Sequence, residues 1–211
     1  MRAIKTWAAL AVLLCVSAAS SADRVVLAPS GRITLPGDVS GLYVWRAAEK
    51  GGHGRLNVGW PQDDLGLELE AETWTLETGR VETLGAQYSV ISEAFTNNLA
   101  PAVSVGVRDI PNRGPFGRAY FLSLSKSVRL TEKGEAILGT LRIHAGYGTH
   151  SVGGGFVGAS VHTPFRLSLA AELYRRRFNA SAELRVMGPL SAYACSLNGA
   201  VYAGLGLRIS R

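Results

Sequence analysis

Long stretches of this chain alternate apolar and polar residues with a period of two, and short segments rich in Gly, Pro, Asn and Arg separate them. The alternation is clearest in the segments 166–174 and 200–209. In the first of these the apolar set is Leu167, Leu169, Ala171 and Leu173. A period of two is typical of a β-strand with one apolar and one polar face. The pattern therefore predicts an all-β chain, although a soluble sandwich and a membrane barrel would both show it.

The N-terminus predicts export from the cytoplasm. Arg2 and Lys5 give it a positive start, an apolar run of ten residues extends from Trp7 to Val16, and the small residues Ser20 to Ala22 form a suitable cleavage site. Ten apolar residues are too few for a spanning helix, which needs roughly 20. We therefore expect residues 1–22 to be a signal peptide that is cleaved after Ala22. Its removal would leave Cys195 as the only cysteine, so a disulfide-stapled domain is not expected.

The mature chain would have 211 − 22 = 189 residues and a net charge of +6 − 2 = +4, because the signal contributes two positive charges and no acid. The arginines occur singly along the strands, without the interleaved aromatic residues of a nucleic-acid surface, so nucleic acid is not an expected partner. No apolar run after the signal reaches the length of a spanning helix. If the protein lies in a membrane, it must do so as a closed barrel, in which every backbone group is paired between strands.

The sequence divides into a leader and a barrel. Residues 23–40 are punctuated by Pro and Gly and are interpreted as a leader or plug-like segment packed at one mouth, and residues 41–211 as a single antiparallel transmembrane β-barrel. We expect 12 strands, with 10 as the alternative. The expected strands are 41–46, 55–60, 67–74, 80–91, 103–108, 118–128, 137–147, 157–161, 166–174, 177–186, 189–196 and 200–209. The glycine cluster Gly153 to Gly155 is interpreted as a turn.

The identity of the polar face favours the membrane barrel over a soluble periplasmic barrel or sandwich. A small soluble barrel fills its interior with bulky apolar side chains, whereas here the face opposite the apolar row carries Gly, Ser, Asn, Glu and Arg. We therefore expect the polar face to line a lumen and the apolar face to contact outer-membrane lipid. The polar network expected to face the lumen consists of Glu68, Glu70, Glu72, Arg108, Arg142, Glu172, Asn179, Glu183, Arg185 and Arg208.

Two details of this network remain open in the sequence. Glu68, Glu70 and Glu72 place like charges roughly 7 Å apart on one face, which is unfavourable unless cations or water stand opposite. Asp109 and Lys126 have no assigned face. Strict alternation along the strand (its parity) would place Lys126 on the apolar face, unless a β-bulge intervenes. The network could line a passage for a polysaccharide, or it could neutralise itself and fill a narrow barrel.

No catalytic or metal-binding constellation emerges from the sequence. His150 and Ser151 are adjacent residues beside a glycine-rich turn, which is a poor arrangement for a base and a nucleophile. The four histidines lack metal-ligand spacing. We therefore expect no enzyme activity, no metal and no cofactor, with a lipid-modifying enzyme as a distant third hypothesis.

Three groups of residues in the second half of the chain resemble the YjbH-like outer-membrane proteins. The first group is Val107, Arg108 and Asp109, followed by Tyr120, Ser125 and Lys126. The second is Gly146, Tyr147, Gly148 and Thr149 with Gly154, Gly155 and Phe156. The third is Ala171 and Glu172 with Arg176, Phe178, Asn179, Ala180 and Arg185. The three groups keep the family's order over about residues 107–211.

The resemblance implies an outer-membrane protein of the cell envelope that takes part in surface exopolysaccharide production or export. Polysaccharide and envelope-biosynthesis proteins would then be partners, and the barrel itself would require the barrel-assembly machinery. The sequence departs from the family at Tyr174 and Arg177, where acidic residues are expected. A small envelope-structure or pore protein without a polysaccharide link is the alternative, followed by a soluble periplasmic binding protein.

Overall fold

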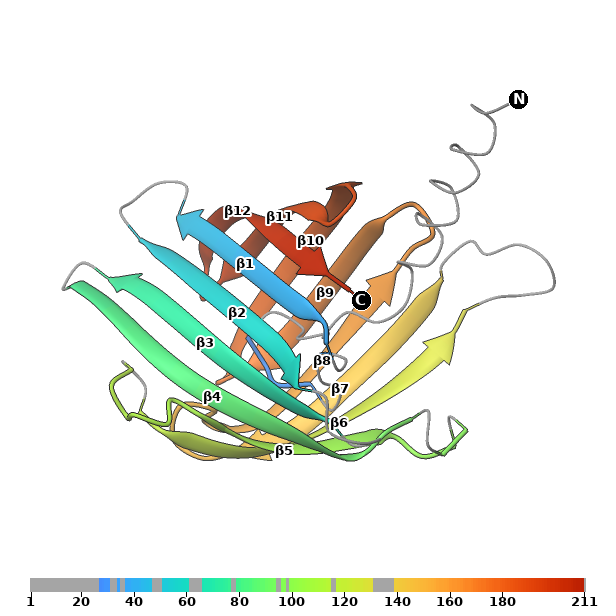
Figure 1. Ribbon diagram of the computed structural model, residues 1–211, viewed down its shortest axis with the longest axis horizontal. Helices are drawn as coiled ribbons and strands as arrows, with labels where there is room; N and C mark the ends of the chain where they lie inside the picture. Colours follow the sequence, from blue (N-terminus) through green and yellow to red (C-terminus); the bar gives the residue numbers. More distant parts are fainter. Residues whose placement is uncertain are drawn as a thin grey trace.

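Twelve antiparallel strands form a closed barrel in the computed structural model, in which each strand pairs with its neighbours in sequence and β1 pairs with β12 (Figure 1). The strands are β1 (Val39–Arg46), β2 (Gly52–Trp60), β3 (Leu67–Leu76), β4 (Gly79–Ile91), β5 (Ala102–Arg108), β6 (Ala119–Arg129), β7 (Thr140–Gly148), β8 (Gly154–His162), β9 (Leu167–Tyr174), β10 (Arg177–Met187), β11 (Leu190–Leu197) and β12 (Ala200–Ile209). The structure describes residues 27–30, 34, 37–46, 51–60, 66–76, 79–93, 96–97, 99–114, 117–130 and 139–210. The predicted fold class is confirmed.

Several predicted element bounds need correction. The barrel begins at Val39 rather than at residue 41, and β2 begins at Gly52 rather than at residue 55. Gly154 and Gly155 belong to β8, where they pair with Gly148 and Tyr147, so the turn includes only Gly153 of the cluster. The reason is that ladder hydrogen bonds use only the backbone, so glycine-rich segments can extend a strand without contributing to the alternating pattern. The signal peptide and the first two residues of the strand expected at 137–147 lie outside the described residues.

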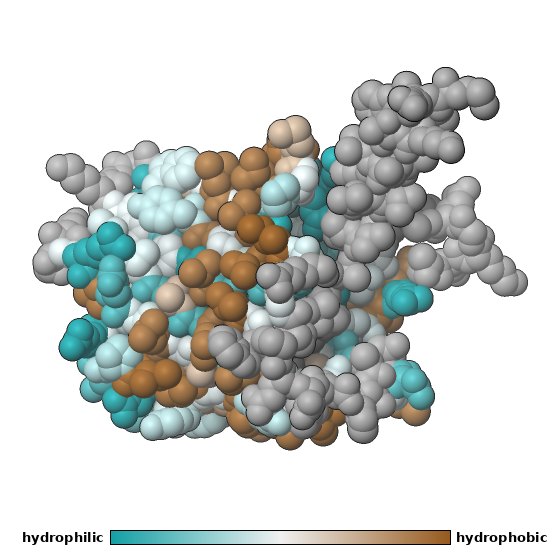
Figure 2. Space-filling model, in the orientation of Figure 1, coloured by the Kyte–Doolittle hydropathy of each residue, from teal (hydrophilic) through white to brown (hydrophobic). Residues whose placement is uncertain are grey.

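The two faces of the sheet differ as the alternation predicts. The outward side chains of Leu169, Ile143 and Leu205 are 46%, 46% and 60% exposed, whereas Glu172 and Asn179 face inward and are 1% and 0% exposed. Figure 2 shows apolar side chains spread over the outer wall. A soluble barrel would present the reverse arrangement, because its outer face must contact water. Among the described residues, no helix is long and apolar enough to cross a membrane.

The barrel has two open ends, which are called mouth A and mouth B. Mouth A carries the connections that follow β1, β3, β5, β7, β9 and β11, and mouth B carries the start of β1 and the end of β12. At mouth A, Asn198 and Gly199 form a tight two-residue hairpin turn, with φ of 53° and 84°. This conformation favours Asn-Gly because both residues must adopt positive φ.

Large inward side chains fit the lumen because glycines face them across the ladder. Phe121 pairs with Gly106, and Phe156 pairs with Gly146. A Cβ atom added at either glycine would overlap the facing phenyl ring. Both rings are buried, with 5% exposure each. Glycine therefore makes room for apolar packing inside the barrel, in addition to the polar network.

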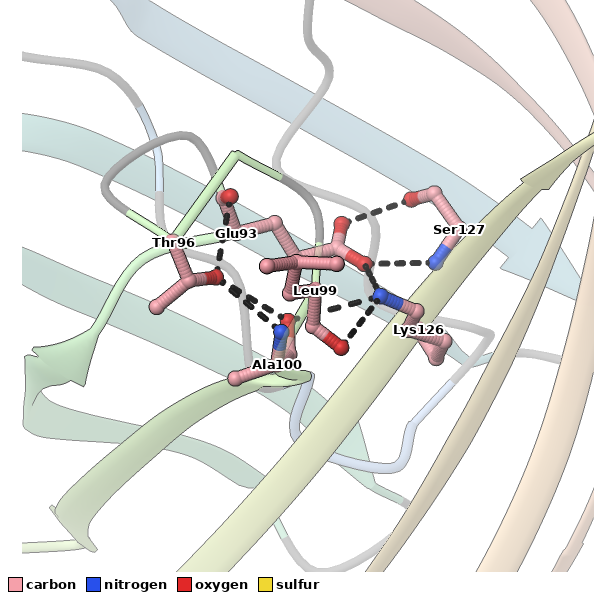
Figure 3. Close-up of polar contacts among 6 residues, drawn as sticks. All are labelled: Glu93, Thr96, Leu99, Ala100, Lys126 and Ser127. Carbon is pink, nitrogen blue, oxygen red and sulfur yellow. Dashed lines mark hydrogen bonds and ion pairs between the residues drawn. The ribbon is translucent and has the colours of Figure 1, made fainter.

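The connection between β4 and β5 forms hydrogen bonds with the end of β6 near mouth B (Figure 3). Because β5 begins only at Ala102, which pairs with Ser125, the last residues of β6 have no partner on β5. Glu93 takes the missing place: its carboxylate accepts hydrogen bonds from the backbone N–H of Ser127 at 2.7 Å and from the Ser127 hydroxyl at 2.8 Å. Lys126 Nζ lies 4.0 Å from Glu93 Oε1 and donates to the Leu99 carbonyl at 3.3 Å.

Aromatic side chains gather on the outer wall near mouth A. They are Tyr43, Trp45, Tyr120, Tyr147 and Phe178, with exposures between 43% and 67%. Their positions lie near the end of β1, the start of β6, the end of β7 and the start of β10. Amphipathic rings at this level of a barrel are typical of a membrane–water interface.

Candidate functional site in the barrel lumen

The segment Leu27–Ser30, hereafter the lumenal segment, lies inside the barrel and is held by Glu172 of β9. The backbone N–H of Leu27 donates to both carboxylate oxygens, at 3.0 and 3.1 Å, and the N–H of Ala28 donates to Oε2 at 2.9 Å. Asn179 Nδ2 donates to Oε1 at 2.8 Å. A buried carboxylate is costly unless it is hydrogen-bonded, and here backbone amides of the chain's own N-terminal part satisfy it. The described part of the predicted leader therefore lies deeper than a cover at one mouth would.

A second set of contacts fixes the other end of the lumenal segment. The Ser30 carbonyl accepts hydrogen bonds from Gln87 Nε2 and, at 3.0 Å, from the Ser104 hydroxyl. The Ser30 hydroxyl shares a hydrogen bond of 3.3 Å with the hydroxyl of Ser125, which in turn shares one of 2.7 Å with His144 Nδ1. Strands β4 to β6 thus bind Ser30, while β9 binds Leu27 and Ala28. The segment therefore extends through the lumen from β9 to β4–β6.

The glutamate row of β3 is accommodated by different partners along its length. Glu68, which is 2% exposed, accepts a hydrogen bond from the backbone N–H of Thr34. Glu72 Oε1 lies 3.6 Å from His53 Nε2 on the paired strand, and the guanidinium of Arg108 interacts electrostatically with both Glu70 and Glu72. The repulsion anticipated from three neighbouring glutamates is therefore offset by one backbone donor, the imidazole of His53 and the guanidinium of Arg108.

Arg108 is the main basic side chain toward mouth A. It is 7% exposed, and its Nη1 donates to the Tyr174 hydroxyl at 3.1 Å, while that hydroxyl donates to the Ser151 carbonyl at 3.0 Å. Its Nε and Nη2 have no hydrogen-bond partner among the described residues. Buried N–H groups of this kind normally bond to water or a ligand. Arg108 thus has donors available to a polar molecule in the lumen.

The remaining members of the predicted network lie toward mouth B. Arg142 Nη1 approaches His162 Nε2 at 3.4 Å, and His162 Nδ1 shares a hydrogen bond of 2.9 Å with the Ser168 hydroxyl. Arg208 interacts electrostatically with Glu183. Asp38, which is buried, also interacts electrostatically with Arg208, so carboxylates and arginines lie together in this part of the lumen.

Two cavities lie in the lumen, one toward each mouth. The cavity toward mouth A admits water-sized molecules over about 60 Å³ and is lined in part by Leu27, Trp74, Arg108 and Tyr174. The cavity toward mouth B offers about 80 Å³, and its lining includes Arg55, His162, Glu183 and Arg208. Both exceed the volume that one water molecule requires. They share no described lining residue, and Leu27 of the lumenal segment lines only the cavity toward mouth A.

All ten predicted lumen residues have inward positions on the barrel, but they do not form one continuous network. Glu172 and Asn179 contact each other and the lumenal segment, Glu70 and Glu72 interact with Arg108, and Glu183 interacts with Arg208 near mouth B. The two positions without an assigned face are also placed. Asp109 is buried and accepts hydrogen bonds from loop amides, including the N–H of Gly114 at 2.7 Å, and Lys126 lies on the outer side of β6.

Some inward residues were missing from the sequence-based site. His144 shares the parity of Arg142, so alternation alone would have identified it. Tyr174 shares the parity of Glu172 in the same way. The hydrogen bonds of Leu27 and Ala28 have no counterpart in the sequence pattern, because every residue except proline has a backbone N–H donor.

His150 and Ser151 lie in the turn between β7 and β8 rather than on a strand. His150 is exposed with φ of 38°, while Ser151 is buried, and its carbonyl oxygen accepts the hydrogen bond from Tyr174. Within the described ranges, no group of three His, Cys, Asp or Glu side chains is arranged to hold a metal ion.

These features define a class of protein: a closed 12-stranded antiparallel barrel with an apolar outer wall and a polar, partly filled lumen. Two solved structures share the fold. One is a KdgM porin, with a TM-score of 0.56 and 11% identity, covering 82% of this chain and 99% of that chain. The other is a KdgM porin in complex with disordered oligogalacturonate, with a TM-score of 0.52, 11% identity and the same coverage.

No protein-family model matches the chain, and no curated protein is significantly similar to it. The resemblance to the YjbH-like family therefore stays a prediction.

Proposed function

We propose that this protein is an outer-membrane β-barrel whose polar lumen binds and passes a saccharide during production or export of surface exopolysaccharide. The observation that carries the proposal is the contrast between the apolar outer wall and a lumen with polar cavities toward both mouths. A barrel with this polarity offers a hydrophilic route through a membrane. The fold shared with a KdgM porin supports the proposal, and the second KdgM porin structure is a complex with disordered oligogalacturonate.

The cavity toward mouth A has groups suited to a sugar. Arg108 offers unpaired N–H donors, Glu72 offers carboxylate oxygens, and the ring of Trp74, stacked on His53 at a centroid distance of 4.0 Å, lines the same cavity. Sugar hydroxyls bond to such polar groups, and the apolar faces of sugar rings pack on aromatic side chains. The exopolysaccharide link itself is supported by the resemblance in residues 107–211.

Passage through the lumen requires the lumenal segment to leave its position. The test is single-channel conductance in planar bilayers for the wild-type protein and for a variant that lacks residues 27–34. We expect the wild type to conduct weakly and the deletion variant to conduct at least about three times more, with a soluble polysaccharide fragment reducing the current. Glu82→Ala is the matched control, because Glu82 is an exposed carboxylate near mouth A, paired with Arg80 at 2.9 Å outside the lumen.

A filled lumen favours the second candidate, an envelope-structure protein that passes no solute. Leu27, Ala28 and Phe156 belong to one buried hydrophobic cluster inside the barrel, an arrangement that stabilises a closed state. If the deletion variant folds but conducts no better than the wild type, this structural role replaces the transport proposal. Loss of surface polysaccharide on deletion of the gene would support the exopolysaccharide link, and unchanged polysaccharide would contradict it.

A further inference from the structure

An apolar groove runs along the outer wall over β4 to β7. Its volume is about 570 Å³, and its lining is almost entirely apolar. The floor contains Val105 and Val107 of β5, and the sides include Tyr88 of β4, Tyr120 of β6 and Tyr147 of β7. The groove exists because β5 presents short side chains outward, while the neighbouring strands present long ones.

The tyrosines lie near both ends of the groove. Tyr120 and Tyr147 are 59% and 67% exposed at the mouth A end, and Tyr88 is 37% exposed toward mouth B. Phenol rings combine an apolar body with a polar tip, so they suit the level at which a lipid chain meets its headgroup. A hydrocarbon chain lying parallel to β5 would find apolar contacts on three sides.

Arg118 lies above this groove at mouth A. It immediately precedes β6, two residues before Tyr120, and its side chain is exposed. Its Nη2 donates to the carbonyl of Ile110, which lies just beyond the end of β5. The guanidinium therefore reaches over the end of the strand that forms the groove floor.

The charge of Arg118 is not neutralised within the described part of the chain, where it forms no ion pair with a carboxylate. Arg80 at the same mouth differs, because it pairs with Glu82 at 2.9 Å. A guanidinium binds phosphate through several N–H donors held in one plane. An arginine without a carboxylate partner in the described part of the chain, placed above an apolar groove, is thus complementary to a molecule with a negative headgroup and a hydrocarbon tail.

We propose that the groove over β4 to β7 and Arg118 form a binding site for an anionic, phosphate-bearing membrane lipid, with one acyl chain against Val105 and Val107 and the phosphate on Arg118. This inference rests on the proposed membrane location and is independent of whether the lumen conducts.

The test is native mass spectrometry of the full barrel released from detergent micelles that contain either phosphatidylglycerol or diacylglycerol with the same acyl chains. We expect the wild-type protein to retain severalfold more phosphatidylglycerol than diacylglycerol. Arg118→Gln should reduce this ratio at least threefold. Arg176→Gln should leave the ratio unchanged, because Arg176 is also exposed at mouth A but lies on the β9–β10 turn, away from the groove.

Val105→Phe tests the groove separately from the headgroup site. A phenyl ring on the floor should lower retention of both lipids at least threefold, and this substitution leaves the contact between Arg118 and Ile110 intact. If both Arg118→Gln and Val105→Phe retain lipids as the wild type does, the proposal is overturned. If Arg118→Gln lacks the heat-dependent gel shift of a folded barrel, Val105→Phe alone decides. A protein that never forms a heat-modifiable barrel would contradict the membrane location, whereas a closed lumen would leave the lipid site standing.

Discussion

The phenyl ring of Phe156 lies directly over Gly146 on the neighbouring strand, inside the barrel. The two residues pair across β7 and β8, and the ring is 5% exposed. A side chain at position 146 would overlap both the ring and the carbonyl oxygen of Leu122. Inward glycines in this barrel therefore make space for aromatic side chains that narrow the lumen.

Gly146→Ala should destabilise the barrel by about 1 to 3 kcal/mol, because the new Cβ forces the ring or the backbone to move in a packed interior. Unfolding in urea, followed by the heat-dependent gel shift, measures the change. Gly155→Ala on the facing strand is the control, because its Cβ would have no neighbour closer than 3.9 Å. Equal effects of the two substitutions would show that the ring does not need the space above Gly146.

Glu172 should control how often the lumenal segment leaves its position. The carboxylate accepts hydrogen bonds from the N–H groups of Leu27 and Ala28, and their loss favours release of the segment, because the freed amides can then bond to water. In an Ala28→Cys, Cys195→Ser background, Glu172→Ala should raise the rate of maleimide labelling at position 28 by about tenfold or more. Ala28 is fully buried in the wild-type barrel.

Two control variants complete the labelling experiment. Phe165→Cys in the same Cys195→Ser background should label rapidly with or without Glu172, because Phe165 is 77% exposed on the β8–β9 turn. Glu82→Ala should leave labelling at position 28 slow. Slow labelling in the Glu172→Ala protein would mean that the hydrophobic contacts of Leu27 hold the segment without the carboxylate.

Alternation predicted the twelve strands and the inward face, because the side-chain period of a strand is two, but it missed the glycine-rich starts of β2 and β8. Parity placed Glu172 and Leu169 on opposite faces, as the structure shows. Parity could not predict that Glu172 binds backbone amides of residues 27 and 28, because contacts over 144 or more positions in sequence depend on the closed barrel. It also could not predict the role of Glu93, which follows from the short length of β5.

Glu93→Ala should destabilise the barrel more than the loss of an exposed ion pair does. The substitution leaves the N–H and hydroxyl of Ser127 without their carboxylate acceptor, at a cost of about 1 to 3 kcal/mol. Glu82→Ala should cost less than about 1 kcal/mol, because exposed ion pairs contribute little. The comparison uses urea unfolding of both variants, and a loss for Glu82→Ala equal to that for Glu93→Ala would contradict the proposed fastening of the β4–β5 connection.

The order of two substitutions on β9 tests the assignment of the inner and outer faces. Leu169 is 46% exposed in the middle of the outward apolar row of β9, so Leu169→Arg should cost about 2 to 4 kcal/mol near the bilayer midplane. Glu172→Ala should cost less, because the freed amides of the lumenal segment can bond to water once the segment moves. Leu173→Arg, closer to mouth A, should cost only about 0 to 1 kcal/mol. Folding titrations from detergent into lipid vesicles measure all three. If Glu172→Ala is the most destabilising, the lumenal segment is an integral part of the folded barrel and the Glu172 contacts stabilise it. If Leu169→Arg costs no more than Leu173→Arg, the outer wall around Leu169 does not contact the hydrocarbon core.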